Sequence, residues 1–458
     1  KAKILFLKST SNSNIKHDLT YESYKMYEEL LRKHQAFDYA DLIIKATEGM
    51  KEGKIRPIPF DWLMVDEYQD SDGIQYDWVQ QHYLKRGTIV TVVGDDDQSI
   101  YGWRNAMGYG GMTRFINDYG PQKIFLSTNY RCGKNIVALA KQLIAFNTNR
   151  AQKEIKPFTS NPEGEFYYMI YPNRSAEVEA IGAEVRSFKD QYSIAVLARN
   201  NKQLDDVETY LQFFEIPIYR MGGESFWDST GAIAVIDIIK IIISNSWGAT
   251  SHLLNIIGVD IDNIDYLSEI FLEIPLSGWE GLIKPLKKEL KKIDVITQAK
   301  IDKGLGFIEK LTAWHNLVNN NFIDMALLSI ADYVNEFFPM YLAGASYSAA
   351  KSLIKFKGSL SQRLNLISNM SKDSKVSGEN KIVLSTLHSS KGTEYDLVWI
   401  CSFEEGSCPS LKNAELEEER RLAYVGITRA KKRLILSRNL EKPESTFIKE
   451  LNLKPSLF

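Results

Sequence analysis

Two short apolar runs, each ending in a cluster of acidic residues, constrain the fold more than any other feature of the sequence. The first is Trp62–Val65, followed by Asp66 and Glu67, and the second is Ile89–Val93, followed by a run of aspartates. The stretch between them has amphipathic helical spacing. A strand, an acidic loop, a helix and another strand are typical of a parallel α/β sheet, in which ligands collect at the carboxyl ends of the strands.

The same alternation returns later in the chain, and a helical stretch interrupts it. Further strands are predicted at Phe166–Ile170, Ile194–Leu197, Ile382–Ser385 and Leu397–Ile400. Residues 245–376 carry mostly Leu, Ile, Lys and Asn at helical spacing. The sequence therefore predicts an α/β fold made of one parallel-sheet domain, a second one, and an all-helical domain inserted into the second.

Composition limits the possible partners and compartments. The 56 Lys and Arg nearly balance the 58 Asp and Glu, so any nucleic-acid surface must be local and created by folding. Cys132, Cys401 and Cys408 have neither CxxC nor Cys/His metal spacing, which argues against a disulfide framework or a zinc site and favours a reducing cytoplasm. The most apolar stretch, Ala232–Ile243, is too short to span a bilayer and predicts a buried helix.

The segment LMVDEYQD at residues 63–70 indicates nucleotide hydrolysis. It places Asp66 and Glu67 next to each other directly after a strand. One such carboxylate can hold Mg²⁺ through its waters while the other activates a water molecule. A solvated acidic turn is the alternative, although few such turns follow an apolar strand and continue with Tyr-Gln-Asp.

The second strand is followed by GDDDQSIYGWR at residues 94–104, which combines an acidic turn, an amide side chain, two aromatic residues and an arginine. Gln98 is suited to sensing a terminal phosphate. Trp103 is suited to stacking on an unpaired base, a contact worth about 1–3 kcal/mol. A single tryptophan is more often part of a core, but the Tyr-Gly-Trp-Arg context favours the stacking platform.

These two segments resemble motifs II and III of the UvrD/Rep/PcrA helicases of superfamily 1, usually written DExxQD and GDxxQSIYxWRGA. Asn105 stands where the family usually has Gly. Four more blocks resemble family motifs in the expected order: STNYR at 127–131, GGESFW at 222–227, LSTLHSSKGTEY at 384–395 and EERRLAYVGITRAK at 418–431. The resemblance covers nearly the whole chain from Phe37 onward and is weakest in the helical insertion.

The resemblance implies a division into RecA-like domains. Residues 37–158 correspond to a first, incomplete parallel-sheet domain, and residues 1–36 to a remnant of its helical insertion. Residues 159–244 and 377–458 correspond to the second parallel-sheet domain. Residues 245–376 correspond to the all-helical domain inserted in it.

The resemblance also implies ATP and Mg²⁺ as cofactors. In the family pattern Asp66 positions Mg²⁺, Glu67 is the catalytic base, and Gln98 couples the terminal phosphate to DNA. Arg131 and Arg429 match arginines that reach the γ-phosphate, and arginine's planar fork stabilises a phosphoryl transition state by about 10³–10⁵ in rate. A solvated basic face is the competing interpretation of Arg429, because its neighbours include Arg420, Arg421, Lys431, Lys432 and Arg433.

Further positions match the nucleotide and DNA contacts of the family. Tyr130 matches the ring that stacks on adenine, and Glu394 matches the residue that touches the ribose. Thr386 and His388 match motif V positions near the single-strand backbone, although His388 is equally suited to a core. The base-stacking platform would be formed by Tyr101, Trp103 and Arg104.

The phosphate-binding loop GxxxxGK[ST], whose amides cradle phosphate and whose lysine neutralises it, does not occur in the sequence. The family places that loop in about its first hundred residues. We therefore expect the chain to begin downstream of it and not to hydrolyse ATP by itself. The Gly-Ile-Gly hairpin with which the family contacts duplex DNA corresponds here to NIIGVD at residues 255–260, so duplex contact by this loop stays open.

The leading hypothesis is an ATP-dependent DNA helicase that moves 3′ to 5′ on single-stranded DNA, acts at junctions with duplex, and serves DNA repair or replication. The direction comes from the resemblance alone. One alternative is a shortened relative without ATPase activity that serves as a DNA-binding or partner-docking scaffold. Another is the motor part of a helicase–nuclease of the RecB or AddA kind.

Overall fold

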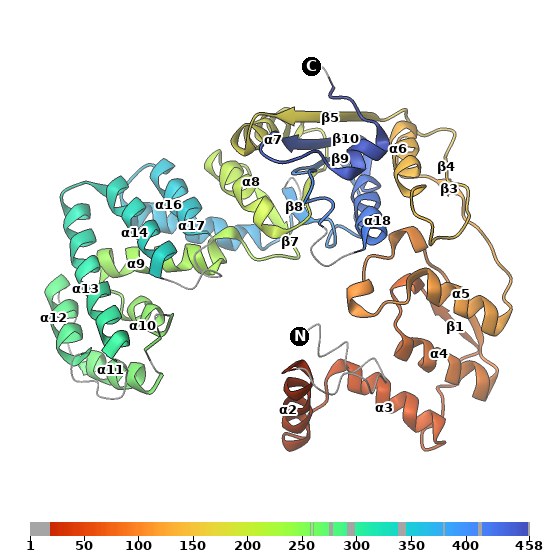
Figure 1. Ribbon diagram of the computed structural model, residues 1–458, viewed down its shortest axis with the longest axis horizontal. Coiled ribbons are helices and arrows are strands. Elements are labelled where there is room, and N and C mark those ends of the chain that lie inside the picture. The colour runs from red at the N-terminus through yellow and green to blue at the C-terminus, as the bar shows by residue number, and fades with distance from the viewer. Residues whose placement is uncertain are drawn as a thin grey trace. The chain divides into compact units, whose positions relative to one another are not determined.

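The structure is a computed structural model that describes residues 19–256, 258–259, 261–273, 278–290, 298–337, 345–378, 381–410 and 415–456 (Figure 1). It has the predicted mixed α/β architecture, with parallel sheets and many helices. Within these residues, no helix is both long enough and apolar enough to cross a membrane.

The strands are β1 (Trp62–Val65), β2 (Ile89–Val92), β3 (Thr128–Asn129), β4 (Lys156–Pro157), β5 (Glu165–Tyr171), β6 (Ile194–Ala198), β7 (Ile218–Met221), β8 (Ile382–Thr386), β9 (Tyr395–Ile400) and β10 (Ala430–Asn439). The main helices are α2 (Leu19–Lys33), α3 (Tyr39–Lys51), α4 (Gly73–Arg86), α5 (Gly108–Tyr119), α6 (Lys134–Ile144), α7 (Arg174–Phe188), α8 (Asn201–Phe213), α9 (Thr230–Ser244), α10 (Trp247–Ile256), α11 (Ile261–Glu273), α12 (Gly278–Leu290), α13 (Gln298–Asn319), α14 (Ile323–Phe337), α16 (Ser346–Lys355), α17 (Leu360–Ser374), α18 (Leu416–Ile427) and α19 (Thr446–Leu451).

β1 and β2 form a parallel pair whose alternating side chains separate a packed face from an open one. The register runs from Trp62 opposite Ile89 to Val65 opposite Val92. Alternate residues, Val65 and Val92 among them, pack against a core formed by Tyr68, Tyr76 and Phe115. Consequently the acidic segments that follow both strands emerge at the same edge of the pair.

Local sequence explains why α4 begins and ends where it does. Asp72 accepts hydrogen bonds from the N–H groups of Ile74 and Gln75, and the Gln75 side chain accepts the N–H of Asp72, which completes a capping box. Gly87 ends the helix at φ 69°, a left-handed conformation that glycine adopts without steric cost. The helix therefore returns the chain to β2, parallel to β1.

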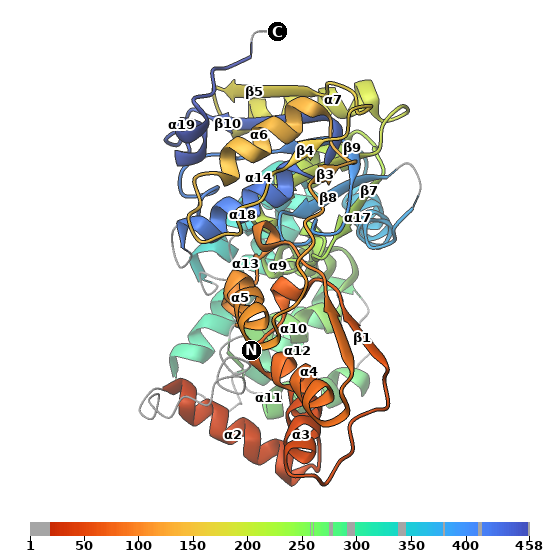
Figure 2. The same cartoon turned by 90° about the vertical axis from the view of Figure 1, so that its right-hand side faces the viewer.

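The larger sheet has six strands in the order β5-β10-β9-β6-β8-β7. β10 pairs in parallel with both β5 and β9, and β7 pairs in parallel with β8. Helix α6 lies against β5 and β10 (Figure 2). The sequence predicted the positions of β5, β6, β8 and β9, but not those of β7 and β10.

The chain divides into two compact units. The first contains residues 1–177, 197–199 and 387–458, and the second contains residues 178–196 and 200–386. One apolar core runs through the second unit from Phe226 to Ile367 and includes most of α9, which is the buried helix predicted at Ala232–Ile243. The described part of residues 245–376 is helical, as predicted.

Candidate active site

The turn that follows β1 presents two exposed carboxylates. Glu67 has a left-handed backbone, with φ 50°, which is uncommon for a residue other than glycine and persists only where the surroundings impose it. Its N–H donates to Oδ1 of Asp66 at 2.8 Å, and the buried Gln69 donates its Nε2 to Oε2 of Glu67 at 2.5 Å. These bonds orient both carboxylates at the carboxyl end of β1.

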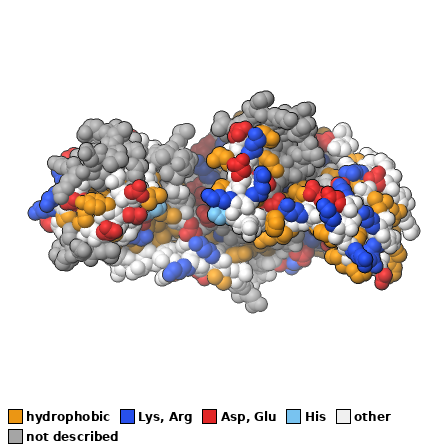
Figure 3. Space-filling view, turned by 90° about the horizontal axis from the view of Figure 1, so that it is seen from below, with side chains coloured by type: hydrophobic (Ala, Val, Ile, Leu, Met, Phe, Trp, Pro, Cys, Tyr) orange, Lys and Arg blue, Asp and Glu red, His pale blue; other side chains and the backbone are white. Residues whose placement is uncertain are grey.

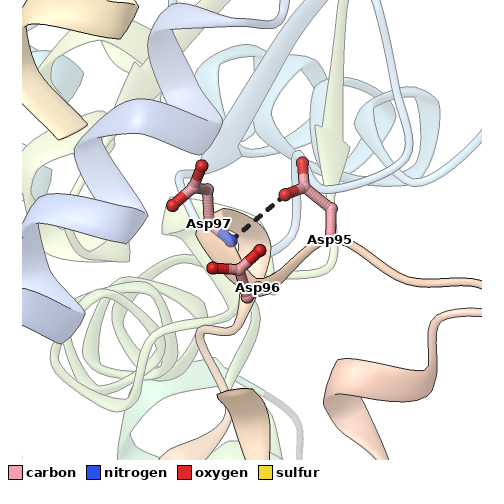
Figure 4. A group of neighbouring side chains, drawn as sticks. All are labelled: Asp95, Asp96 and Asp97. Carbon is pink, nitrogen blue, oxygen red and sulfur yellow. Dashed lines mark hydrogen bonds between the residues drawn. The ribbon is translucent and has the colours of Figure 1, made fainter. Parts of the chain in front are cut away.

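Three consecutive aspartates follow β2, and their carboxylate oxygens lie within 4.8 Å of one another (Figure 4). The Lys153 Nζ lies 2.5 Å from an oxygen of Asp95 and of Asp96 and 3.1 Å from Asp97. Arg150 binds both oxygens of Asp97, at 2.8 and 2.6 Å. Each of the three carboxylates thus has a cationic side chain as partner, so we assign no metal ion to this cluster.

Gln98 connects the acidic turn to the end of α18. Its Nε2 donates to Oδ2 of Asp95 at 2.7 Å, and its Oε1 accepts a hydrogen bond from Nη2 of Arg429 at 3.3 Å. Two residues assigned from separate motifs, 331 positions apart, therefore touch within the first unit.

Arg429 is almost completely buried, with 1% of its surface exposed. Its other hydrogen bonds go to the carbonyl oxygens of Val425 (2.8 Å) and Thr393 (3.2 Å) and to the hydroxyl of Thr428 (3.1 Å). Burial, with a smaller contribution from the positive charge of Arg131, lowers the pKa of Arg429 to about 10. The burial contradicts the solvated basic face, because a solvated arginine would not lose its surface in this way.

Arg131 and Glu394 form an ion pair with each other. Arg131 donates from Nε to Oε2 of Glu394 at 2.8 Å, and both side chains are partly exposed. This hydrogen bond lowers the pKa of Glu394, so the carboxylate stays ionised. The adjacent Tyr130 is 70% exposed and rests on Phe158, with ring centroids 4.8 Å apart. An exposed ring supported from behind is able to receive a flat ligand.

Lys391, in the loop between β8 and β9, joins the two turns. Its Nζ lies 2.6 Å from Oδ2 of Asp70 and 3.4 Å from Oε2 of Glu67, and it donates to the carbonyl oxygen of Gln98 at 3.0 Å. The side chain is 8% exposed. Burial raises the pKa of Asp70, and the Lys391 ammonium opposes that rise. The two acidic turns and the β8–β9 loop therefore meet at one cation.

The aromatic segment after Gln98 forms an open platform. Trp103 is 53% exposed, and its ring meets that of Tyr101 edge to face at 6.4 Å. The Arg104 guanidinium lies 4.7 Å from the Tyr101 ring centroid and 5.7 Å from that of Trp103. The ring centroid of His388 lies 6.4 Å from that of Tyr101. Burial lowers the pKa of His388 to about 4, so it is neutral at physiological pH.

Asn105, the departure from the family's glycine, ends the short 3₁₀ turn at residues 102–104. It has φ 65°, and its N–H donates to the carbonyl oxygen of Gly102. Asparagine tolerates this left-handed conformation better than most residues with a side chain. The substitution therefore keeps the turn that presents Trp103.

The structure brings together most, but not all, of the residues predicted for the site. In the first unit Gln98 touches Arg429, and Lys391 links Glu67 to the Gln98 backbone. Thr386 is the last residue of β8 and belongs to the second unit, whereas the platform belongs to the first. In the helical insertion, the predicted duplex-contact loop includes Ile257 and Asp260, which lie outside the described residues.

Sequence reasoning missed three cations. Arg150 and Lys153 lie in a stretch without motif signals, and Lys391 was part of a recognised motif but received no role. A concentration of acids in the turn after β2 was the available signal, since buried carboxylates require counter-charges.

Comparison with known proteins gives a consistent result. A family model described as the UvrD-like helicase C-terminal domain matches residues 124–264 and 282–441, and one described as the UvrD/REP helicase N-terminal domain matches residues 2–119.

Several curated proteins are similar along most of the chain. "DNA helicase II" of Haemophilus influenzae is 27% identical over 480 aligned positions, covering 95% of this chain and 63% of that protein. "ATP-dependent DNA helicase PcrA" of Bacillus subtilis is 29% identical, with 93% and 63% covered, and "ATP-dependent DNA helicase Rep" of Buchnera aphidicola is 28% identical, with 98% and 71% covered. The chain thus spans 63% of the length of the first two relatives.

Proposed function

Because the chain belongs to the UvrD-like helicase family, we propose that it carries the catalytic turns and the DNA platform of an ATP-dependent motor that moves 3′ to 5′ along single-stranded DNA and opens junctions with duplex. The observation that carries the proposal is the contact between Gln98 and Arg429, at 3.3 Å. It joins the loop that continues into the Trp103 platform to a buried cation suited to phosphate. The direction of movement rests on the family resemblance.

The residues fit a nucleotide with its magnesium ion. Arg429 is buried among neutral acceptors, so an anionic phosphate oxygen would relieve the burial of its charge. Asp66 is exposed and oriented, and its carboxylate would hold Mg²⁺ through water, which spreads the charge of the phosphate oxygens. Tyr130 offers an exposed ring for the base, and Glu394 a carboxylate for the ribose.

Glu67 is assigned as the general base of hydrolysis. Gln69 and Lys391 both approach Oε2, so we assign Oε1 as the atom that takes the proton from the attacking water. Lys391 lies beside both Glu67 and Asp70, and its positive charge stabilises the two carboxylates in these positions. Hydrolysis also needs the phosphate-binding loop GxxxxGK[ST], so we propose that the chain turns over ATP only together with such a loop.

The DNA side of the proposal rests on the exposed platform. Trp103 presents an aromatic face, and Arg104 lies over both rings of the platform, an arrangement suited to unpaired bases and their phosphates. Basic and acidic side chains are interspersed on the face in Figure 3. Because the 56 Lys and Arg of the chain are balanced by 58 Asp and Glu, we propose that binding depends on this local group.

The test of hydrolysis is Glu67→Gln in a protein that carries this chain together with a GxxxxGK[ST] loop. We expect single-strand-stimulated ATP hydrolysis to fall by about 10²–10⁴-fold, because the general base is lost. Glu215→Gln is the matched control, since Glu215 is exposed and has the same left-handed backbone, with φ 55°. Equal turnover in the two variants would show that Glu67 is not the base.

The test of DNA binding is Trp103→Ala in the chain as it stands. We expect single-strand affinity to fall by about 1–3 kcal/mol with little change in thermal stability, because Trp103 is half exposed. Trp62→Ala is the control, because Trp62 is 63% exposed on β1 and outside the platform. If both substitutions, or neither, weakened binding, the platform assignment would be wrong.

A further inference from the structure

Lys153 lies 55 residues beyond Gln98 in the sequence, yet it is central to the turn that carries Gln98. Its side chain is 15% exposed, and its Nζ lies 2.5 Å from Oδ1 of both Asp95 and Asp96. Arg150 already binds both oxygens of Asp97. The main role left for Lys153 is therefore to neutralise Asp95 and Asp96.

The two oxygens of Asp95 have different partners. Oδ1 accepts from Lys153 and, at 3.1 Å, from the N–H of Asp97. Oδ2 accepts from Nε2 of Gln98 at 2.7 Å. An ionised Asp95 can only accept hydrogen bonds, so it attracts the amide nitrogen of Gln98 and leaves the amide oxygen for Arg429.

We propose that Lys153 is a positioning residue for Gln98: it keeps Asp95 an acceptor at both oxygens and so fixes the Gln98 amide with its oxygen toward Arg429. The consequence for catalysis rests on the proposed function, in which Gln98 senses phosphate. The inferred orientation of the Gln98 amide does not depend on the proposed function. Lys153 thus acts through Asp95 and Gln98 and needs no contact with nucleotide.

The charges around Asp95 support this sequence of contacts. Burial raises the pKa of Asp95, but the Lys153 ammonium and its hydrogen bond, together with the hydrogen bonds from Gln98 and the N–H of Asp97, hold the pKa below its ordinary value. The other charged or titratable groups that face the turn are Asp96, Asp97, Arg150, Lys391, Arg421, Tyr424 and Arg429. Without Lys153, burial and the adjacent carboxylates would act on Asp95 in the same direction, so it would take up a proton more readily.

Protonation of Asp95 would change which hydrogen bonds it can form with Gln98. A carboxylic acid can donate from one oxygen, so it no longer selects the nitrogen end of the Gln98 amide. If the amide rotated, its NH₂ group would face the donor of Arg429, and the contact between the two motifs would be lost. A lysine that served only stability would leave this orientation independent of pH.

The experiment follows the Gln98 side-chain amide by NMR in the chain labelled with [¹⁵N]glutamine, with Gln98→Glu used to identify its resonance. We expect a constant chemical shift from about pH 5 to about pH 8 in the wild type. In Lys153→Gln we expect the resonance to titrate within that window, because burial and the adjacent carboxylates then raise the pKa of Asp95 without the opposing ammonium. Lys153→Arg should restore the constant shift, and Lys134→Gln, which removes an exposed ion pair with Glu163, should not alter it.

A Gln98 resonance that does not titrate in folded Lys153→Gln would overturn the proposal. If Lys153→Gln does not fold, Asp95→Asn replaces it, because Lys153 keeps Asp96 and Asp97 as partners. In that variant the Gln98 resonance should move at every pH, and an unmoved resonance would overturn the proposal equally. The readout needs neither ATP nor DNA, so failure of the proposed function at Glu67→Gln is distinguishable from failure here.

Discussion

Two buried arginines, one in each unit, show how similar burial serves different purposes. Arg220, on β7, has 1% of its side chain exposed and binds Glu208 and Asp205 at 2.8 Å each, with a further hydrogen bond to the carbonyl oxygen of Asn201. Arg429 is equally buried, but its hydrogen bonds with described residues go only to carbonyl, hydroxyl and amide oxygens.

The hydrogen-bond partners of the two arginines indicate different roles. Arg220 is neutralised inside its own unit, and Ser225 and the N–H of Phe226 complete the bonds of Glu208. Arg429 keeps a charge that burial and Arg131 disfavour, as its lowered pKa of about 10 shows. A buried charge with neutral partners is costly for stability and valuable for binding an anion. We therefore interpret Arg220 as a structural arginine and propose Arg429 as the one that binds phosphate.

The largest expected effect comes from removing Arg429, the arginine proposed to bind phosphate. In the protein with a GxxxxGK[ST] loop, Arg429→Met should lower single-strand-stimulated ATP hydrolysis by about 10³–10⁵-fold, because the phosphoryl transition state loses its guanidinium. Turnover per folded molecule should be little changed in Arg220→Met. The measurement is steady-state hydrolysis normalised to folded protein. An equal loss of turnover in the two variants would contradict the different roles assigned to Arg220 and Arg429.

The order reverses for stability. Arg220→Met leaves the buried Glu208 and the partly buried Asp205 without a counter-charge and should lower the free energy of unfolding by about 3–5 kcal/mol. Arg429→Met leaves only neutral acceptors unpaired and should cost about 1–3 kcal/mol. Denaturant unfolding of both variants measures the difference, and Arg220→Met combined with Glu208→Gln should recover part of the loss. An equal cost at both sites would remove the distinction.

A smaller effect is expected when pH falls. The pKa of Asp95 is lowered on folding, because Lys153 and the hydrogen bonds from Gln98 and Asp97 together outweigh burial. The stabilising contribution of Asp95 is therefore present above the unfolded pKa and is lost as pH falls through the folded value. Burial raises the pKa of Glu208 and of Asp205, so their contribution is not lost on acidification. Hydrogen exchange, corrected for intrinsic rates, should therefore rise at residues 95–101 before it rises at residues 205–226. Asp95→Asn should abolish that difference, and simultaneous loosening of both segments in the wild type would contradict it.

Much of the fold was predictable because burial patterns are local. An apolar run that ends in acids identified β1 and β2, and the apolar α9 was recognised from its composition. β10 begins Ala-Lys-Lys-Arg, and its charges concealed a strand that is buried over most of its length. β7 reads Ile-Tyr-Arg-Met, so Arg220 interrupts what would otherwise be an apolar run.

The site was predictable only as far as motifs reach. Asp66, Glu67, Gln98 and Arg429 came from segments with characteristic spacing, but contacts between distant segments leave no periodic signal. Lys391 meets Asp70 across 321 residues, and Lys153 meets Asp96 across 57. A lysine is equally common on any solvated surface, so its type alone did not indicate that burial had paired it with carboxylates.

The central claim is that Arg429 binds phosphate. Its most direct test is the affinity of the protein that carries a GxxxxGK[ST] loop for ADP and Mg²⁺, measured with and without aluminium fluoride, which mimics the charge of the phosphoryl transition state. If Arg429 stabilises the charge of the transition state, the wild type should bind ADP with aluminium fluoride more tightly than ADP alone. Arg429→Met should lose this enhancement while keeping its affinity for ADP. An Arg429→Met protein that retained the full enhancement would contradict the account.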